Sequence, residues 1–98
     1  MSSTPKKDPP VDRVKNVNGM IEVRIWRNVD EEGQANYCTT PAERSYFDKQ
    51  EKKYKTTTTL FDEDNLEVSK LYDRAYERIR ELREADYQAN KVAQQQAA

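Results

Sequence analysis

The sequence predicts an α+β fold in which an antiparallel sheet of three to four strands packs on one long, amphipathic C-terminal helix. Two observations predict this class. Short runs in the middle of the chain alternate apolar and polar side chains, which is typical of half-buried strands. A later segment repeats apolar residues at three- and four-residue steps, the pattern of a helix with one buried face.

The first twelve residues lack the apolar side chains that a packed segment needs. Three prolines lie among polar residues in 1–12, so we expect a disordered N-terminal tail there. The single α+β domain is expected to span residues 13–86. Residues 87–98, which end in glutamine and alanine without apolar periodicity, are expected to form a frayed or disordered tail.

Two strands and a turn are predicted next, at residues 13–17 and 20–27. In the second strand Ile21, Val23 and Ile25 would face one side, and Arg24 and Trp26 the other. The pair Asn18-Gly19 lies between the two runs and favours a tight type I′ hairpin turn, in which both central residues have positive φ.

Further strands are expected on either side of Pro41. Residues 35–40 have strand composition, and the proline predicts an edge position or a bulge before pairing resumes through Arg44, Tyr46 and Phe47. Residues 54–60 include four threonines, whose β-branched side chains favour a further strand.

The helix is predicted to begin at Asp62 or Asp64, since an aspartate accepts the free N–H groups of a first turn. Phe61 would form a hydrophobic staple with Leu66. The stripe expected to face the sheet consists of Val68, Leu71, Tyr72, Ala75, Ile79 and Leu82. The opposite face is expected to be solvated and consists of Arg74, Glu77, Arg78, Glu81 and Arg83.

The composition excludes several kinds of chemistry. Without histidine the chain cannot form a Ser/His/Asp triad or the usual zinc sites, and its single cysteine, Cys38, cannot form an internal disulfide. We therefore expect no enzyme activity, no catalytic residue, no metal, no cofactor and no small-molecule substrate. No secretory signal or bilayer-spanning apolar run is evident, which predicts a cytoplasmic protein without membrane contact.

The charge balance argues against binding nucleic acid by bulk positive charge. The chain has 17 basic and 18 acidic residues, a net charge of −1. Residues 13–60, the predicted sheet, hold nine basic and seven acidic side chains, and the remainder is net acidic. Any basic site must therefore be local and is expected on the sheet.

Aromatic and basic side chains alternate along the predicted strands. Bases stack on aromatic rings and phosphates bind lysine or arginine, so this combination favours single-stranded DNA or RNA. The predicted nucleic-acid-binding residues are Arg24, Trp26, Arg44, Tyr46, Lys53, Tyr54 and Lys55. The alternative is a protein-interaction or regulatory domain that uses this face for homodimerisation or partner binding. A homodimer is favoured in either case, because a core of this size buries little surface.

Several segments resemble a family of short uncharacterised bacterial proteins. They are Ile25-Trp26-Arg27-Asn28, Tyr37, Arg44-Ser45-Tyr46-Phe47-Asp48, Tyr54-Lys55, Leu60-Phe61 and the helical Asp64, Leu66, Val68, Lys70, Asp73 and Ala75. That family carries no settled activity. The layout of a sheet followed by one helix is also similar to PC4 and Whirly-like single-stranded DNA-binding proteins, which implies a dimer with a curved binding sheet, although their strongly basic segment is missing here.

Overall fold

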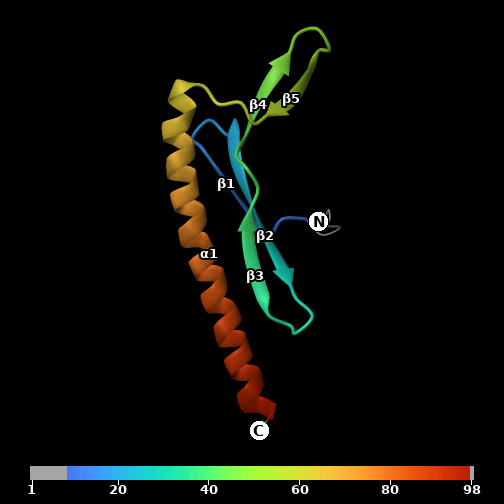
Figure 1. The fold of residues 1–98 in the computed structure, drawn as a ribbon, viewed down its shortest axis with the longest axis vertical. Coiled ribbons are helices and arrows are strands. Elements are labelled where there is room, and N and C mark those ends of the chain that lie inside the picture. The colour runs from blue at the N-terminus through green and yellow to red at the C-terminus, as the bar shows by residue number, and fades with distance from the viewer. Residues whose placement is uncertain (1–8, 98) are drawn as a thin grey trace.

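The computed structural model of the chain describes residues 9–97 and has the predicted α+β class (Figure 1). Its elements are β1 (Asp12–Lys15), β2 (Ile21–Val29), β3 (Ala35–Thr39), β4 (Glu43–Asp48), β5 (Lys53–Thr57) and α1 (Asp62–Ala97). All five strands belong to one antiparallel sheet, slightly more than the three to four expected. Of the predicted tail 1–12, residues 1–8 lie outside the described residues, and Asp12 already belongs to β1.

The first hairpin forms as predicted, but its turn does not. Gly19 has a φ of 75°, whereas the only described non-glycine residue with positive φ is Lys52, so Asn18-Gly19 is not a type I′ turn. The loop is wider because the side chain of Asn16 takes part in it. Its Oδ1 accepts the N–H of Ile21 at 3.1 Å, while the N–H of Gly19 binds the Asn16 carbonyl at 3.0 Å.

Pro41 separates two strands that share one neighbour. β3 pairs with Ile25–Val29 of β2, and β4 pairs with Ile21 and Glu22 of the same strand. The predicted interruption at Pro41 is therefore confirmed. The backbone N–H groups on both sides of Pro41 are hydrogen-bonded. Thr40 donates to the Arg24 carbonyl, and Ala42 donates to the Tyr72 hydroxyl at 2.9 Å.

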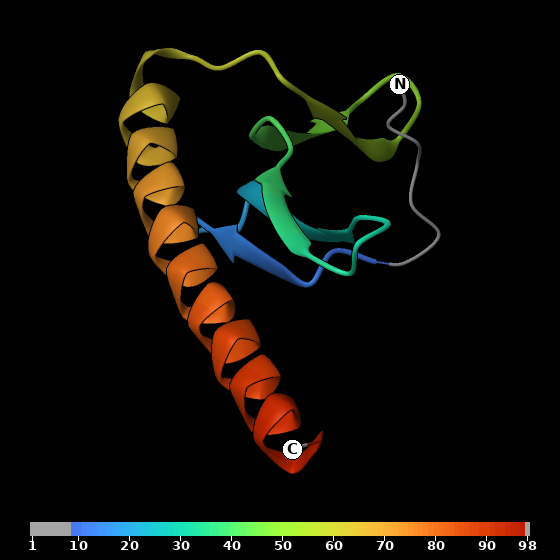
Figure 2. The same ribbon diagram turned by 60° about the horizontal axis from the view of Figure 1, so that its bottom comes forward.

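The hairpin of β4 and β5 extends away from the helix (Figures 1 and 2). It is held to the rest of the structure by the short β2–β4 pairing and, at its base, by the ion pair between Arg44 of β4 and Asp64 of α1. β5 ends at Thr57, three residues before the predicted end at Leu60, and the following segment crosses to the start of the helix.

α1 begins at Asp62, one of the two predicted positions. The carboxylate of Asp64 accepts the N–H of Phe61 at 2.9 Å, and the Phe61 carbonyl accepts the N–H groups of Asp64 and Asn65. This is the reciprocal half of a capping box. Phe61 and Leu66 remain 62% and 65% exposed, so the predicted staple does not bury them.

The core lies between the sheet and the first half of α1. Among the described residues the buried apolar side chains are Val14, Ile21, Val23, Ile25 and Ala42 from the sheet side and Val68, Leu71 and Ala75 from α1. Leu60, Ile79 and Leu82 pack at its margin, whereas Tyr72 is 39% exposed. Each fully buried aliphatic side chain contributes about 1.5–3 kcal/mol relative to an exposed one.

The helix continues to Ala97, past Tyr87, where the sequence predicts fraying. The segment from Tyr87 onward has no glycine or proline and several good helix formers, which allows a helix without a packing partner. Its side chains from Tyr87 to Gln96 are all exposed. It therefore projects beyond the sheet (Figure 1).

Candidate functional site

Trp26 lies on the sheet side that faces away from α1, here called the outer face. Its neighbours Ile25 and Arg27 contact the core and the helix, so alternation along β2 directs Trp26 outward, opposite Cys38 of β3. The indole is half-buried, and its Nε1 is buried without a hydrogen-bond partner among the described residues. An unsatisfied buried N–H is costly, which makes this position unusual.

Arg24 shares the outer face, but its charge is already bound. Its Nε binds Glu22 at 2.6 Å, and another guanidinium nitrogen lies 3.6 Å from Glu43 of β4. The hydrogen bond with Glu22 is the main reason that the pKa of Arg24 is raised. An approaching phosphate would have to compete with two carboxylates.

Arg44 lies on the other side of the sheet. It pairs in register with Ile21, whose side chain is in the core, and its Nε binds Asp64 of α1 at 3.1 Å. Its guanidinium also lies 5.3 Å from the centre of the Phe61 ring. Arg44 therefore ties β4 to the start of the helix, and it does not join Arg24 and Trp26.

Tyr46, Lys53 and Lys55 follow Arg44 on that same side, because they occupy matching positions in the β4–β5 ladder. Lys55 binds both Asp48, at 3.1 Å, and Glu51, and these hydrogen bonds, with Glu51 first, raise its pKa. Lys53 lies 3.3 Å from Glu51. Both lysines are thus paired within their own hairpin.

Tyr54 alternates to the outer face together with Phe47, a residue that the sequence analysis placed in a strand but not in the site. The two rings meet edge to face with centroids 5.2 Å apart. They remain 69% and 49% exposed. Phe47 directly follows Tyr46 and Tyr54 directly precedes Lys55, so strand alternation places Phe47 and Tyr54 on the opposite face from Tyr46 and Lys55.

The seven predicted residues are therefore divided between two sides. Arg24, Trp26 and Tyr54 belong to the outer face; the rest, Arg44, Tyr46, Lys53 and Lys55, belong to the side of the core and helix. Val11 directly precedes β1 and is 45% exposed. It donates its N–H to the carbonyl of Ile25, the neighbour of Trp26 in β2.

Several contacts between α1 and the sheet were not predicted. Arg78 and Arg74, expected to be solvated, bind the Asp12 carboxylate at 2.6 Å and the Lys15 carbonyl at 3.0 Å. The bond to Arg78 is the main reason that the pKa of Asp12 is lowered. Such pairs depend on how helix and sheet meet, and sequence spacing gives no signal for them.

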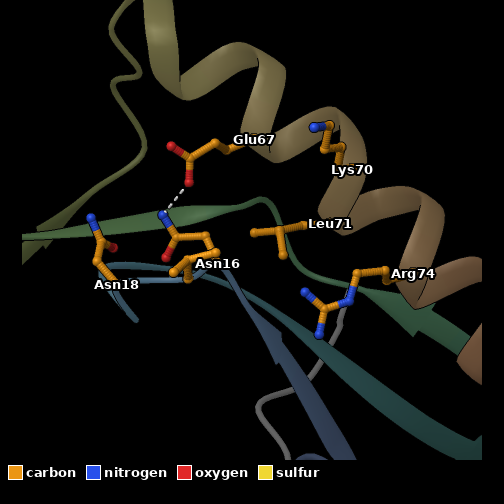
Figure 3. A pocket seen from close by; sticks show the side chains of 7 residues that line it. Asn16, Asn18, Glu67, Lys70, Leu71 and Arg74 are labelled. Carbon is orange, nitrogen blue, oxygen red and sulfur yellow. Dashed lines mark hydrogen bonds between the residues drawn. The ribbon is translucent and has the colours of Figure 1, made fainter.

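A pocket of about 480 Å³ lies between the first hairpin loop and α1 (Figure 3). Leu71 lines it, and Asn16 donates to the Glu67 carboxylate at 2.6 Å across it. Arg74 reaches the Lys15 carbonyl beside it. These polar groups already bind one another, so the arrangement fixes the loop to the helix.

Residues 9–97 contain no cluster of three or more histidine, cysteine, aspartate or glutamate side chains suited to a metal ion. In the same range, the helix has no stretch apolar and long enough to cross a bilayer. Comparisons of the chain with family models, with curated proteins and with solved structures found no match.

Proposed function

We propose that this domain is a non-catalytic protein-interaction module that forms a homodimer through the outer face of its sheet. The proposal rests on one observation: Phe47 and Tyr54 are exposed and Trp26 is half-buried on this face, while Arg24, next to Trp26, is paired with Glu22 and Glu43. Trp26, Phe47 and Tyr54 supply the apolar area. Aromatic side chains are enriched, and charged side chains are depleted, at the cores of protein interfaces.

The ion pairs of the predicted nucleic-acid-binding residues disfavour the binding of nucleic acid. Binding a phosphate at Arg24 or Lys55 would require the loss of bonds to Glu22 or to Asp48 and Glu51. Arg44 is further engaged by Asp64. The single-stranded DNA or RNA partner favoured by the sequence stays a prediction, supported by the position of Trp26 and Arg24 on one face.

A second copy fits the outer face because the described core is small. A second layer on the sheet would add the burial that a domain of this size lacks.

Sedimentation velocity of the full chain, from about 1 μM to about 1 mM, tests this proposal. We expect a concentration-dependent dimer and a change in the emission of Trp26, the only tryptophan. The double variant Phe47→Ser/Tyr54→Ser should weaken the dimer, whereas Leu66→Ser, which alters an exposed side chain of α1, should not.

A monomer throughout this range would contradict the proposal. An oligonucleotide titration at two salt concentrations then separates the alternatives. Quenching of Trp26 at low salt that is lost at high salt would instead support nucleic-acid binding, because phosphate contacts weaken steeply as salt rises.

A further inference from the structure

β1, β2 and β3 form a three-stranded part of the sheet, and its two outer edges differ in what covers them. At β1, Arg74 of α1 binds the Lys15 carbonyl and Arg78 binds the Asp12 side chain, so the helix covers that edge. β3 pairs with β2 on one side, and no strand among residues 9–97 pairs with its other side. An open edge is a template for a further strand.

The register identifies which backbone groups are open. Asp30 donates to the Gln34 carbonyl at 2.9 Å and Thr40 to the Arg24 carbonyl at 3.2 Å, so the hydrogen-bonded pairs on β3 fall at even-numbered residues. The N–H and C=O groups of the odd-numbered residues point toward the open edge. These residues are Ala35, Tyr37 and Thr39.

A groove runs between this edge and α1. It has a volume of about 540 Å³, and its walls include Tyr37 of β3 and, from the helix, Tyr76, Ile79, Arg83 and Tyr87. Tyr76 and Tyr87 are each 60% exposed. A strand added to β3 would direct every second side chain to the helix side of the sheet, into this groove.

The cations of the groove are less engaged than those of the hairpin. Arg83 has no ion pair within the described residues, and Arg80 lies 3.6 Å from Glu77, with both side chains more than 60% exposed. Glu84 also lines the groove but accepts a hydrogen bond from Gln88 at 2.7 Å. The groove therefore offers aromatic surface beside the guanidinium of Arg83, which has no ion pair among the described residues, and that of Arg80, which lies 5.9 Å from the centre of the Tyr76 ring.

We propose that this groove binds an extended, acidic segment of a partner protein, which adds to β3 as a further antiparallel or parallel strand. Ala35, Tyr37 and Thr39 supply the backbone hydrogen bonds, the tyrosines take apolar side chains, and Arg80 and Arg83 bind a carboxylate. The β3 strand of a second copy is a poorer occupant, because its sequence ANYCT contains no carboxylate. The site is separate from the outer face around Trp26.

Fluorescence anisotropy with the full chain and a labelled peptide of about eight residues tests the proposal. Every second residue of the probe is threonine, and the positions between the threonines are valine and glutamate in turn. The control peptide has lysine in place of glutamate. We expect saturable binding of the acidic probe and at least about tenfold weaker binding of the lysine peptide. Equal binding of the two, or no binding of the acidic probe at about 1 mM, would overturn the proposal.

Two pairs of variants examine the backbone and the charge separately. Thr39→Pro removes an outward N–H without touching the β2–β3 ladder and should abolish binding, whereas Thr39→Val should retain it. Arg83→Gln should weaken binding about fivefold to tenfold, and Lys91→Gln, on the exposed end of α1, should not.

Circular dichroism tests whether Thr39→Pro is folded. If this variant is unfolded, the comparison of Arg83→Gln with Lys91→Gln decides. Unchanged binding in folded Thr39→Pro, or in Arg83→Gln, contradicts the proposal. If Thr39→Pro loses the dimer but still binds the peptide, the open edge of β3 belongs to a second copy. That result would also overturn the proposal.

Discussion

Tyr37 of β3 donates a hydrogen bond from its hydroxyl to the carboxylate of Asp86, far along α1. The guanidinium of Arg27 in β2 binds the same carboxylate, with its closest nitrogen at 3.0 Å. The apolar core ends near Leu82, so this cluster is what holds the next turn of the helix to the sheet. It also fixes Tyr37, which lines the groove beside the open edge of β3.

Replacing Asp86 by alanine should lower the free energy of unfolding by about 1–2 kcal/mol. Tyr37 and Arg27 both lose a charged acceptor, but the site is partly exposed and screening by solvent limits the effect. Urea unfolding followed by circular dichroism measures this change. Glu84→Ala is the matched control on the same helix and should change the free energy by less than about 0.5 kcal/mol.

The stability of the domain should fall in acid. Hydrogen bonds from Tyr37 and then Arg27 lower the pKa of Asp86, and the bond from Arg78 lowers the pKa of Asp12. A lowered carboxyl pKa stabilises the fold above the unfolded value of about 3.9, and this contribution is lost as pH falls through the folded pKa.

Urea unfolding between about pH 7 and about pH 2 should therefore give a declining free energy of unfolding, mainly below about pH 4. Asp86→Asn removes one of the titrating groups, so its decline should be shallower than that of the natural chain. An identical decline in both proteins would show that the Asp86 cluster contributes nothing to acid sensitivity.

Periodicity predicted the main elements because alternation and helical spacing are local properties of the chain. The second strand, Ile21, Val23 and Ile25 as its buried side, and the helical stripe at Val68, Leu71 and Ala75 were all confirmed. The predicted type I′ turn was wrong because the Asn16 side chain, in place of a backbone carbonyl, accepts the N–H of Ile21. The pair Asn18-Gly19 gives no signal for this hydrogen bond.

The candidate site was harder to predict because it depends on which side of the sheet each residue occupies. Pro41 breaks the alternation between β3 and β4, so the side occupied by Arg44 follows from the pairing of β4 with β2. The roles of Arg27 and Arg78 depend on residues more than fifty positions away, whose proximity only the packed helix creates.

Leu71 and Leu66 of α1 provide a test of the core. Leu71 is 1% exposed and Leu66 is 65% exposed, although both lie in the first turns of the helix. Leu71→Ala should cost about 2–5 kcal/mol because it leaves a cavity between helix and sheet. Leu66→Ala should cost less than about 0.5 kcal/mol, and similar losses in the two variants would contradict the assigned helix orientation.

Two truncations separate the anchored part of α1 from its projecting end. Removal of residues 91–98 deletes the side chains of residues 91–96, which are all exposed, and leaves Asp86 a full turn inside the helix, so helical circular dichroism should decrease while unfolding stability changes little. Ending the chain after Arg83 also removes Asp86, and with it the acceptor for Tyr37 and Arg27. The second truncation should therefore lower the midpoint of thermal unfolding by about 4–8 °C for each kcal/mol lost. Equal destabilisation by both truncations would mean that residues beyond Asn90 support the fold, for example by contact with a second chain.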